Sequence, residues 1–216
     1  MANFDFKNLI LVNPVKLDDE CYARAMHARD ILDNAKIVKN FNKSIKNVDY
    51  LVATSSIETS NDKKHLRNAS NIEDISEKLL KIDGKIGLVF GREDYGLYNE
   101  EIALCDLLLK IPTSKKYLSM NLSHAVGIVL YSLFINIETK TKNYTKVGKL
   151  EKEKLFTFFS NLLDNINYPD HKKEKTNIMF KRIMGRAIPS KWEYHTLMGV
   201  FSQTIKKLKR KENKKN

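Results

Sequence analysis

Four short apolar runs, each ended by a polar residue, glycine or proline, constrain the fold of this 216-residue chain more than any other feature. They lie at residues 8–12, 48–53, 85–90 and 107–111. A continuous apolar run of this length is typical of a strand buried on both faces of a sheet. Stretches with helical character, 18–34 and 72–80, separate the runs. The sequence therefore predicts an α/β fold with a mostly parallel sheet that helices cover on both faces.

The carboxyl ends of these strands are where the sequence predicts a ligand site. In open α/β sheets, ligands bind just beyond the carboxyl ends of parallel strands. The segments that follow the last three strands, 54–56, 91–97 and 111–121, contain small or polar residues. The polar stretch 57–71 has no apolar periodicity and is predicted to be a loop.

One segment, 125–137, is apolar nearly all round and is predicted to form a buried helix with Ser123 as its N-cap. It is too short to span a bilayer, and no other stretch approaches the length that a membrane span needs. The start of the chain does not have the pattern of a signal peptide. We therefore expect a protein without a membrane segment.

The charge of the chain is unevenly distributed. Residues 1–139 carry 18 basic and 19 acidic side chains, whereas residues 140–216 carry 20 basic and 7 acidic ones, so the whole net charge of +12 lies in the last third. The polar, lysine-rich stretch 139–148 predicts a boundary between a domain at 1–139 and a basic extension at 140–216. Apolar periodicity predicts helices at 155–166 and 175–186, and the capping box from Ser190 to Glu193 predicts a third.

A basic appendage of this kind is typical of proteins that bind nucleic acid, and a solvated tail without a partner is the alternative. Two cysteines are too few for a disulfide framework, and the five histidines lack ligand spacing, so no metal site is predicted.

Four blocks of sequence, taken in order, resemble the SPOUT superfamily of RNA methyltransferases and its TrmH/TrmJ branch. The blocks are LILVNP at 9–14, LVATSS at 51–56, LVFGREDYGL at 88–97 and IPT…LSMNLSHAVGIVLY at 111–131. The stretch FKRIMGRAIPSKWEYHTLMGV at 180–200 resembles the helical extension of the TrmJ group. The resemblance implies an α/β domain with a C-terminal trefoil knot followed by a small helical extension, a homodimer, and a cytoplasmic enzyme. It also implies transfer of a methyl group from S-adenosylmethionine to a ribose 2′-hydroxyl of tRNA, in the anticodon loop.

The resemblance also implies which residues form the site. The cofactor would be held by residues of three loops, namely Thr54, Ser55, Ser56, Gly91, Ile111, Leu118, Ser119, Met120 and Asn121. Glu93, Ser119 and Asn121 are the catalytic candidates, and helix capping or bracing of the loops is the alternative for each. The RNA-binding candidates are Arg92, Lys206, Lys207, Lys209, Arg210 and Lys211. For Arg92, an ion pair with Glu93 of the partner subunit is also open.

One departure from the family pattern concerns its opening element. The family normally has a further strand and helix, with an N-x-G-x-x-x-R-type motif, before the block that stands here at 9–14. We expect that this chain has either a truncated start or a short form with little activity, and that it is poorly active and poorly soluble alone. A catalytically silent RNA-binding or regulatory protein is therefore the main alternative, and a flavodoxin-like nucleotide-binding protein is a third.

Overall fold

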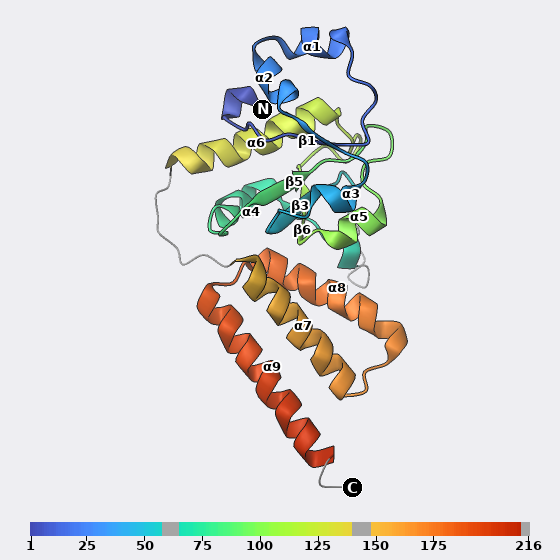
Figure 1. The fold of residues 1–216 in the computed structure, drawn as a ribbon, viewed down its shortest axis with the longest axis vertical. Helices are drawn as coiled ribbons and strands as arrows, with labels where there is room; N and C mark the ends of the chain where they lie inside the picture. The colour runs from blue at the N-terminus through green and yellow to red at the C-terminus, as the bar shows by residue number, and fades with distance from the viewer. Residues whose placement is uncertain (58–64, 140–147, 213–216) are drawn as a thin grey trace.

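The computed structural model describes residues 1–57, 65–139 and 148–212 of the chain. A four-stranded sheet at its centre has the order β4 (Ser70–Asn71), β6 (Leu107–Lys110), β3 (Tyr50–Thr54) and β5 (Ile86–Val89). β1 (Ile10–Val12) and β2 (Lys36–Val38) form a separate small sheet (Figure 1). The strand pairs of both sheets are parallel, which confirms the predicted α/β class.

The central strand β3 builds a core on both sides of the sheet. Because side chains alternate along a strand, Tyr50 and Val52 pack on one face against α4 (Ile72–Leu79) and α6 (Leu122–Thr139). Leu51 and Ala53 pack on the other face with residues of α5 (Asn99–Leu104) and α3 (Phe41–Ser44). The prediction that both faces are covered is confirmed.

The region between the first two predicted strands differs from the sequence prediction. Instead of one helix over 18–34, the chain forms α1 (Asp19–Ala25), a 3-10 turn η2 (Met26–Ala28) and α2 (Arg29–Asp33). Met26 interrupts the helix with a φ of 48°. None of the residues of α1 or α2 is buried, so no apolar face is packed that would favour a continuous helix. The strand β2, the short helix α3 and the helix α5 were not predicted.

The prediction for 57–71 is partly wrong. Residues 58–64 lie outside the described residues. After them the chain forms a 3-10 turn, η3 (His65–Arg67), and the strand β4, which pairs with β6. Two residues of strand are too few for apolar alternation to be visible in the sequence.

The helix α6 begins earlier than predicted and is not buried all round. Asn121, rather than Ser123, caps it: the Asn121 Oδ1 atom accepts hydrogen bonds from the backbone N–H of Ser123 (2.9 Å) and its hydroxyl (2.8 Å). Val129 and Leu133 pack against the sheet, whereas Tyr131 is 52% exposed. The sheet covers one side of the helix, and Phe4 of the 3-10 turn η1 (Ala2–Phe4) packs against Tyr131 and Phe134 with ring centroids 5.8 and 5.9 Å apart. Part of the apolar surface still remains exposed.

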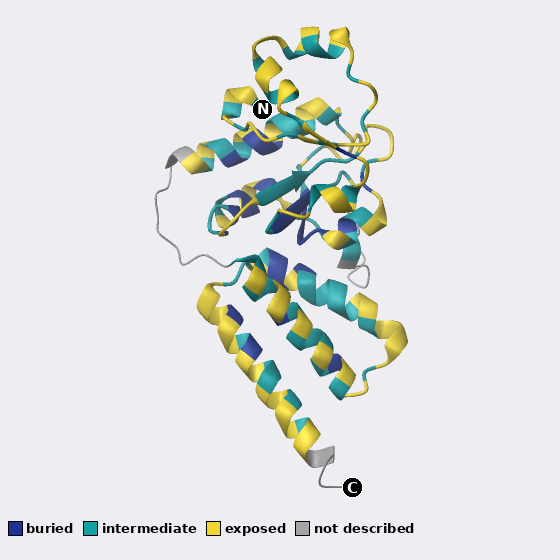
Figure 2. Ribbon diagram, in the orientation of Figure 1, coloured by how far each residue is buried: buried dark blue, intermediate teal, exposed yellow. Residues whose placement is uncertain are grey.

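Three long helices form the C-terminal extension, α7 (Lys149–Asn165), α8 (Asp170–Ala187) and α9 (Lys191–Glu212). The predicted capping box is present, because the Glu193 carboxylate accepts from the backbone N–H of Ser190 at 2.7 Å and the Ser190 hydroxyl accepts from the N–H of Glu193 at 3.3 Å. Leu155, Met184 and Tyr194 make a core of their own. Figure 2 shows that α9 is mostly exposed, whereas α7 and α8 mix exposed, intermediate and buried residues.

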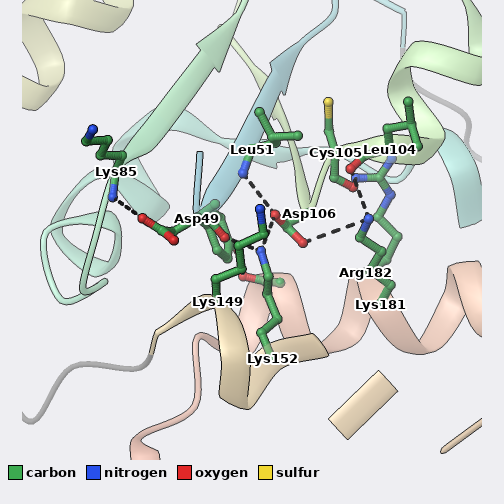
Figure 3. A network of polar contacts seen from close by, with 12 residues as sticks. Asp49, Leu51, Lys85, Leu104, Cys105, Asp106, Lys149, Lys152, Lys181 and Arg182 are labelled. Carbon is green, nitrogen blue, oxygen red and sulfur yellow. Dashed lines mark hydrogen bonds and ion pairs between the residues drawn. The ribbon is translucent and has the colours of Figure 1, made fainter. Parts of the chain in front are cut away.

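A buried polar network attaches the extension to the amino ends of the central strands (Figure 3). The Asp106 carboxylate, 4% exposed, accepts from the backbone N–H of Leu51 at 2.9 Å and from Lys152 Nζ of α7 at 2.8 Å. The guanidinium of Arg182, on α8, donates to the carbonyls of Cys105 and Ile102 at 3.0 and 2.7 Å. Both bonds to Asp106 reach its Oδ2 atom, whereas the buried Oδ1 atom has no hydrogen-bond partner among the described residues and lies 3.9 Å from Lys181 Nζ. The network joins α7 and α8 to the sheet through the Oδ2 bonds and the Arg182 bonds.

The environment of Cys105 leads to a prediction about thiol reactivity. Burial raises the pKa of the Cys105 thiol to about 12, and since the thiolate is the nucleophile, a raised pKa keeps this thiol protonated and inert. We expect iodoacetamide at pH 8 to modify the half-buried Cys21 of the native protein and leave Cys105 intact. Mass spectrometry of the digested protein measures this, with urea-unfolded protein as the control in which both thiols react. Modification of Cys105 at equal rates in both states would contradict the described burial.

Candidate functional site

Three loops meet at the carboxyl edge of the central sheet because β3 lies between β5 and β6. Ala53 is paired with Val89 of β5, and Thr54 is paired with Leu109 of β6. Beyond the strands, the Thr54 hydroxyl donates to the carbonyl of Val89 at 3.1 Å and the Ser55 N–H donates to the carbonyl of Leu109 at 3.0 Å. The segments 54–56, 91–97 and 111–121 therefore leave the sheet next to one another, as the sequence predicts.

Gly91 stands at the start of a closed turn. The backbone N–H groups of Arg92 and Gly96 each donate to the carbonyl of the other, at 3.0 and 2.9 Å. A Cβ atom added to Gly91 would lie 2.1 Å from the carbonyl carbon of Gly96, so any side chain here would open the turn. Gly96 itself has a φ of 65°, in the left-handed region that favours glycine.

The side chain of Arg92 is engaged within its own chain. Its guanidinium donates to both carboxylate oxygens of Glu101 on α5, each at 3.0 Å, and lies 4.4 Å from the ring centroid of Tyr98. This hydrogen bond lowers the pKa of Glu101 below its ordinary value and raises that of Arg92. The structure thus gives Arg92 a partner that the sequence did not suggest, while Glu93 is exposed to solvent.

The third loop brings apolar and polar groups together. Ile111 is half-buried against the core, Met120 is half-buried, and Leu118 is 45% exposed. The Thr113 hydroxyl donates to the carbonyl of Leu118 at 3.2 Å and braces the loop. Ser119 is exposed next to them. Apolar side chains beside backbone polar groups can hold a ring system with a polar rim, such as adenine.

Arg67 is a site residue that sequence reasoning missed. From η3, its guanidinium donates to the Ser55 hydroxyl at 3.2 Å, to the Asn99 side-chain oxygen at 3.0 Å and to the carbonyl of Leu97 at 3.4 Å. It therefore joins the loop after β3 to the segment after β5. No sequence signal marks it, because it lies in an aperiodic polar stretch and its partners are between 12 and 32 residues away.

The predicted RNA-binding lysines lie elsewhere, on α9. Lys206, Lys207, Lys209 and Arg210 are exposed, and the side chain of Lys211 lies outside the described part of the structure. In Figure 1 this end of α9 points away from the sheet. The cofactor-loop candidates and the tail candidates are therefore two separate groups.

Two further features were searched for in the described ranges, a metal site and a helix that could cross a membrane. Across them, no group of three or more His, Cys, Asp or Glu side chains is arranged to hold a metal ion. Nor does any described helix combine the length and the apolar character that crossing a membrane requires.

Comparison with known proteins identifies the family. Residues 1–131 match the model of the SpoU rRNA methylase family. The chain is 42% identical over 207 residues to the tRNA (cytidine-2′-O-)-methyltransferase TrmJ of Methanocaldococcus jannaschii, which covers 93% of this chain and 89% of that protein. It is 33% identical over 215 residues to the enzyme of the same name from Sulfolobus acidocaldarius. This alignment covers 99% of this chain and 88% of that protein.

Solved structures agree with this result. A probable methylase family protein from Haemophilus influenzae Rd KW20, 27% identical, superposes with a TM-score of 0.63 over 100% of this chain and 89% of its own. TrmJ from Z. mobilis ZM4, 21% identical, has the same fold, with a TM-score of 0.64 over 94% and 89% of the two chains. The resemblance seen in the four sequence blocks is confirmed, and the chain belongs to the SpoU family of RNA methylases.

Proposed function

We propose that the protein methylates a ribose 2′-hydroxyl in the anticodon loop of tRNA, in the cytoplasm, with S-adenosylmethionine as methyl donor. The observation that carries the proposal is the convergence of three loops at one edge of the sheet, which the Thr54 and Ser55 hydrogen bonds hold together. The names of the relatives support the substrate.

The residues of the three loops fit such a cofactor. Ile111, Leu118 and Met120 offer apolar surface for adenine, beside backbone groups of 54–56 and 111–121 that can bind its polar edge. At Gly91 the backbone of the turn is packed so tightly that no side chain fits, because a Cβ atom there would lie 2.1 Å from the carbonyl carbon of Gly96. When bound, S-adenosylmethionine supplies an electrophilic methyl group.

The residues of the protein must align the ribose hydroxyl with the methyl group of the donor. Transfer to a hydroxyl is an in-line displacement, so the ribose oxygen must lie opposite the methyl–sulfur bond and must lose its proton as the new bond forms. We assign the orientation of the ribose and the loop to Ser119 and Asn121. The Asn121 side-chain oxygen is already occupied by its cap on α6, which fixes the position of the amide. Glu93 is exposed in the segment that follows β5, and we assign it to shaping the loops.

We further propose that the domain 1–139 contains a trefoil knot at its carboxyl end and that the protein is a homodimer, as its family implies. The partly exposed apolar surface of α6 supports the dimer, because Ile128 is 37% exposed and Tyr131, although its ring contacts Phe4, is 52% exposed on a helix of otherwise apolar character. Exposed apolar area of this kind is typical of a subunit interface.

The test is methyl transfer to an unmodified tRNA transcript, with donor labelled in the methyl group and the product nucleosides mapped by mass spectrometry. A 2′-O-methylated nucleoside is expected, and a transcript with a 2′-deoxy residue at the mapped position is the matched control. Cofactor binding without any transfer would overturn the proposal and favour the catalytically silent alternative.

The basic end of α9 leads to a separate prediction. Deleting residues 206–216 removes seven basic residues and one glutamate. The affinity for tRNA should therefore fall, and log Kd should depend less steeply on the logarithm of the salt concentration. About 0.7–0.9 units of slope are lost for each phosphate contact removed. Cofactor affinity should stay the same, since this part of α9 does not contribute to the three loops.

Filter binding across a salt series measures the slope, and calorimetry measures cofactor affinity. Replacing Lys206, Lys207 and Arg210 together by glutamine is the control that retains the helix, and it should reproduce most of the loss. An equal fall in cofactor affinity would show that the two groups of residues are not independent.

A further inference from the structure

The helix α9 has one packed face and one bare face. Tyr194 and Met198 are 3% and 8% exposed and join the core of the extension. On the opposite side, successive turns present exposed residues that lie within about 40° of one line along the helix, at 3.6 residues per turn. These residues are Trp192, Gly199, Gln203, Lys206 and Arg210.

Trp192 is the notable member of this face. It is 75% exposed, and no ring or cation contact to it is found among the described residues. Two turns further on, a Cβ atom added to Gly199 would have nothing within 4 Å. The face therefore has an exposed aromatic ring near the start of the helix and no bulky side chain at Gly199, about 10 Å further along.

The positive charge of this face of α9 indicates which kind of molecule it binds. Between Tyr194 and Arg210, α9 contains no acidic residue, and Glu193 is held by the capping box. A strip about 24 Å long, at 1.5 Å rise per residue, is thus free of acidic residues and ends in a cluster of cations. An exposed aromatic residue on the same face as these cations suits single-stranded RNA, whose bases stack on aromatic rings while its phosphates follow basic groups. A membrane surface would need a continuous apolar stripe, which Gly199 and Gln203 interrupt.

We propose that the bare face of α9 is an RNA-contacting surface on which Trp192 stacks against an unpaired base. Lys206, Lys207 and Arg210 would bind phosphates further along the same RNA, about 20 Å or more from Trp192 at 1.5 Å rise per residue. The proposal rests on the proposed function for its substrate and adds the residue that holds a base. It assigns to the extension a contact with the base itself, beyond its attraction for the backbone.

The experiment uses a property of the chain, since Trp192 is its sole tryptophan. Tryptophan emission of the full chain is followed during titration with an unmodified tRNA transcript, with a single-stranded oligoribonucleotide, with heparin and with anionic lipid vesicles. Stacking on a base should quench more than half of the emission with both RNAs. Heparin, a polyanion without bases, should bind and leave the emission nearly unchanged, and vesicles should have no effect.

Substitutions give a second measurement. Trp192→Ala should weaken binding of fluorescently labelled tRNA about fivefold or more, the loss expected for one stacked base, and Trp192→Phe should recover most of it. Leu150→Ala, which removes another apolar side chain of the extension, 60% exposed, is the matched control and should change nothing.

Three results would overturn the inference: RNA binding without quenching, equal quenching by heparin, or an emission change with vesicles alone. Methylation of tRNA by a protein whose Trp192 emission does not respond would leave the proposed function intact and reject this surface. Quenching of Trp192 emission by RNA without any methyl transfer would support this surface and reject the proposed function.

Discussion

Replacing Gly91 by alanine should lower the affinity for S-adenosylmethionine at least tenfold, which corresponds to about 1.4 kcal/mol. The reason is steric, because the added methyl group would lie 2.1 Å from the carbonyl carbon of Gly96 and 2.5 Å from the N–H nitrogen of Leu97. The turn 92–96 must open to accept it, and the loop after β5 then moves away from its neighbours. Isothermal titration calorimetry measures the affinity.

Gly127→Ala is the matched control. Gly127 lies in α6, where an added Cβ atom would have nothing within 4 Å, and alanine is favoured over glycine inside a helix. This variant should bind the cofactor as the parent protein does and melt at an equal or higher temperature. If Gly91→Ala melted cooperatively and bound the cofactor normally, the turn at 92–96 would have no part in the site.

Replacing Lys152 by methionine should reduce the free energy of unfolding by about 3–5 kcal/mol, the usual cost of removing one partner of a buried ion pair. The Asp106 carboxylate would keep its bond from Leu51 and lose the cation 2.8 Å away. Lys181 Nζ, 3.9 Å from the other carboxylate oxygen, is too distant to donate a hydrogen bond in its place. Urea unfolding, followed by circular dichroism, measures the loss.

Lys149→Met provides the comparison on the same helix turn. Lys149 is half-buried and donates to the carbonyl of Lys46 at 3.2 Å, so its loss should cost no more than about 1 kcal/mol. In the double variant Asp106→Asn with Lys152→Met, the uncompensated charge is gone, and much of the stability should return. Equal losses for the two single lysine variants would mean that the Asp106–Lys152 pair is not effectively buried.

The central sheet could be predicted from the sequence because its strands are continuous apolar runs. β3, β5 and β6 lie within one or two residues of the predicted runs, and the loops that follow them are the predicted ones. β2 was missed since three residues, Lys36–Val38, carry too little pattern. α6 was predicted as buried because composition reveals an apolar helix and does not reveal how many of its sides a single chain covers.

The arrangement of the candidate loops was predictable from the sequence, whereas most of their contacts were not. The segments that contain Gly91 and Asn121 follow neighbouring strands as expected, but Asn121 caps α6 in place of Ser123. Arg92 binds Glu101, nine residues further along the chain on a helix that was not predicted. Arg67 joins two loops through partners that become neighbours only when β3 and β5 pair. Such contacts depend on the tertiary structure, which local sequence does not encode.

The buried attachment of α7 and α8 at the amino ends of the strands has a consequence for the choice of nucleotide. The cofactor loops lie at the opposite ends of the same strands, and the bonds of Asp106 and Arg182 leave the helices little freedom to swing relative to the sheet (Figure 3). If RNA binds on α9 and reacts at the carboxyl edge as we propose, the distance between the two surfaces is fixed by the fold. We then expect this distance to select the methylated nucleotide.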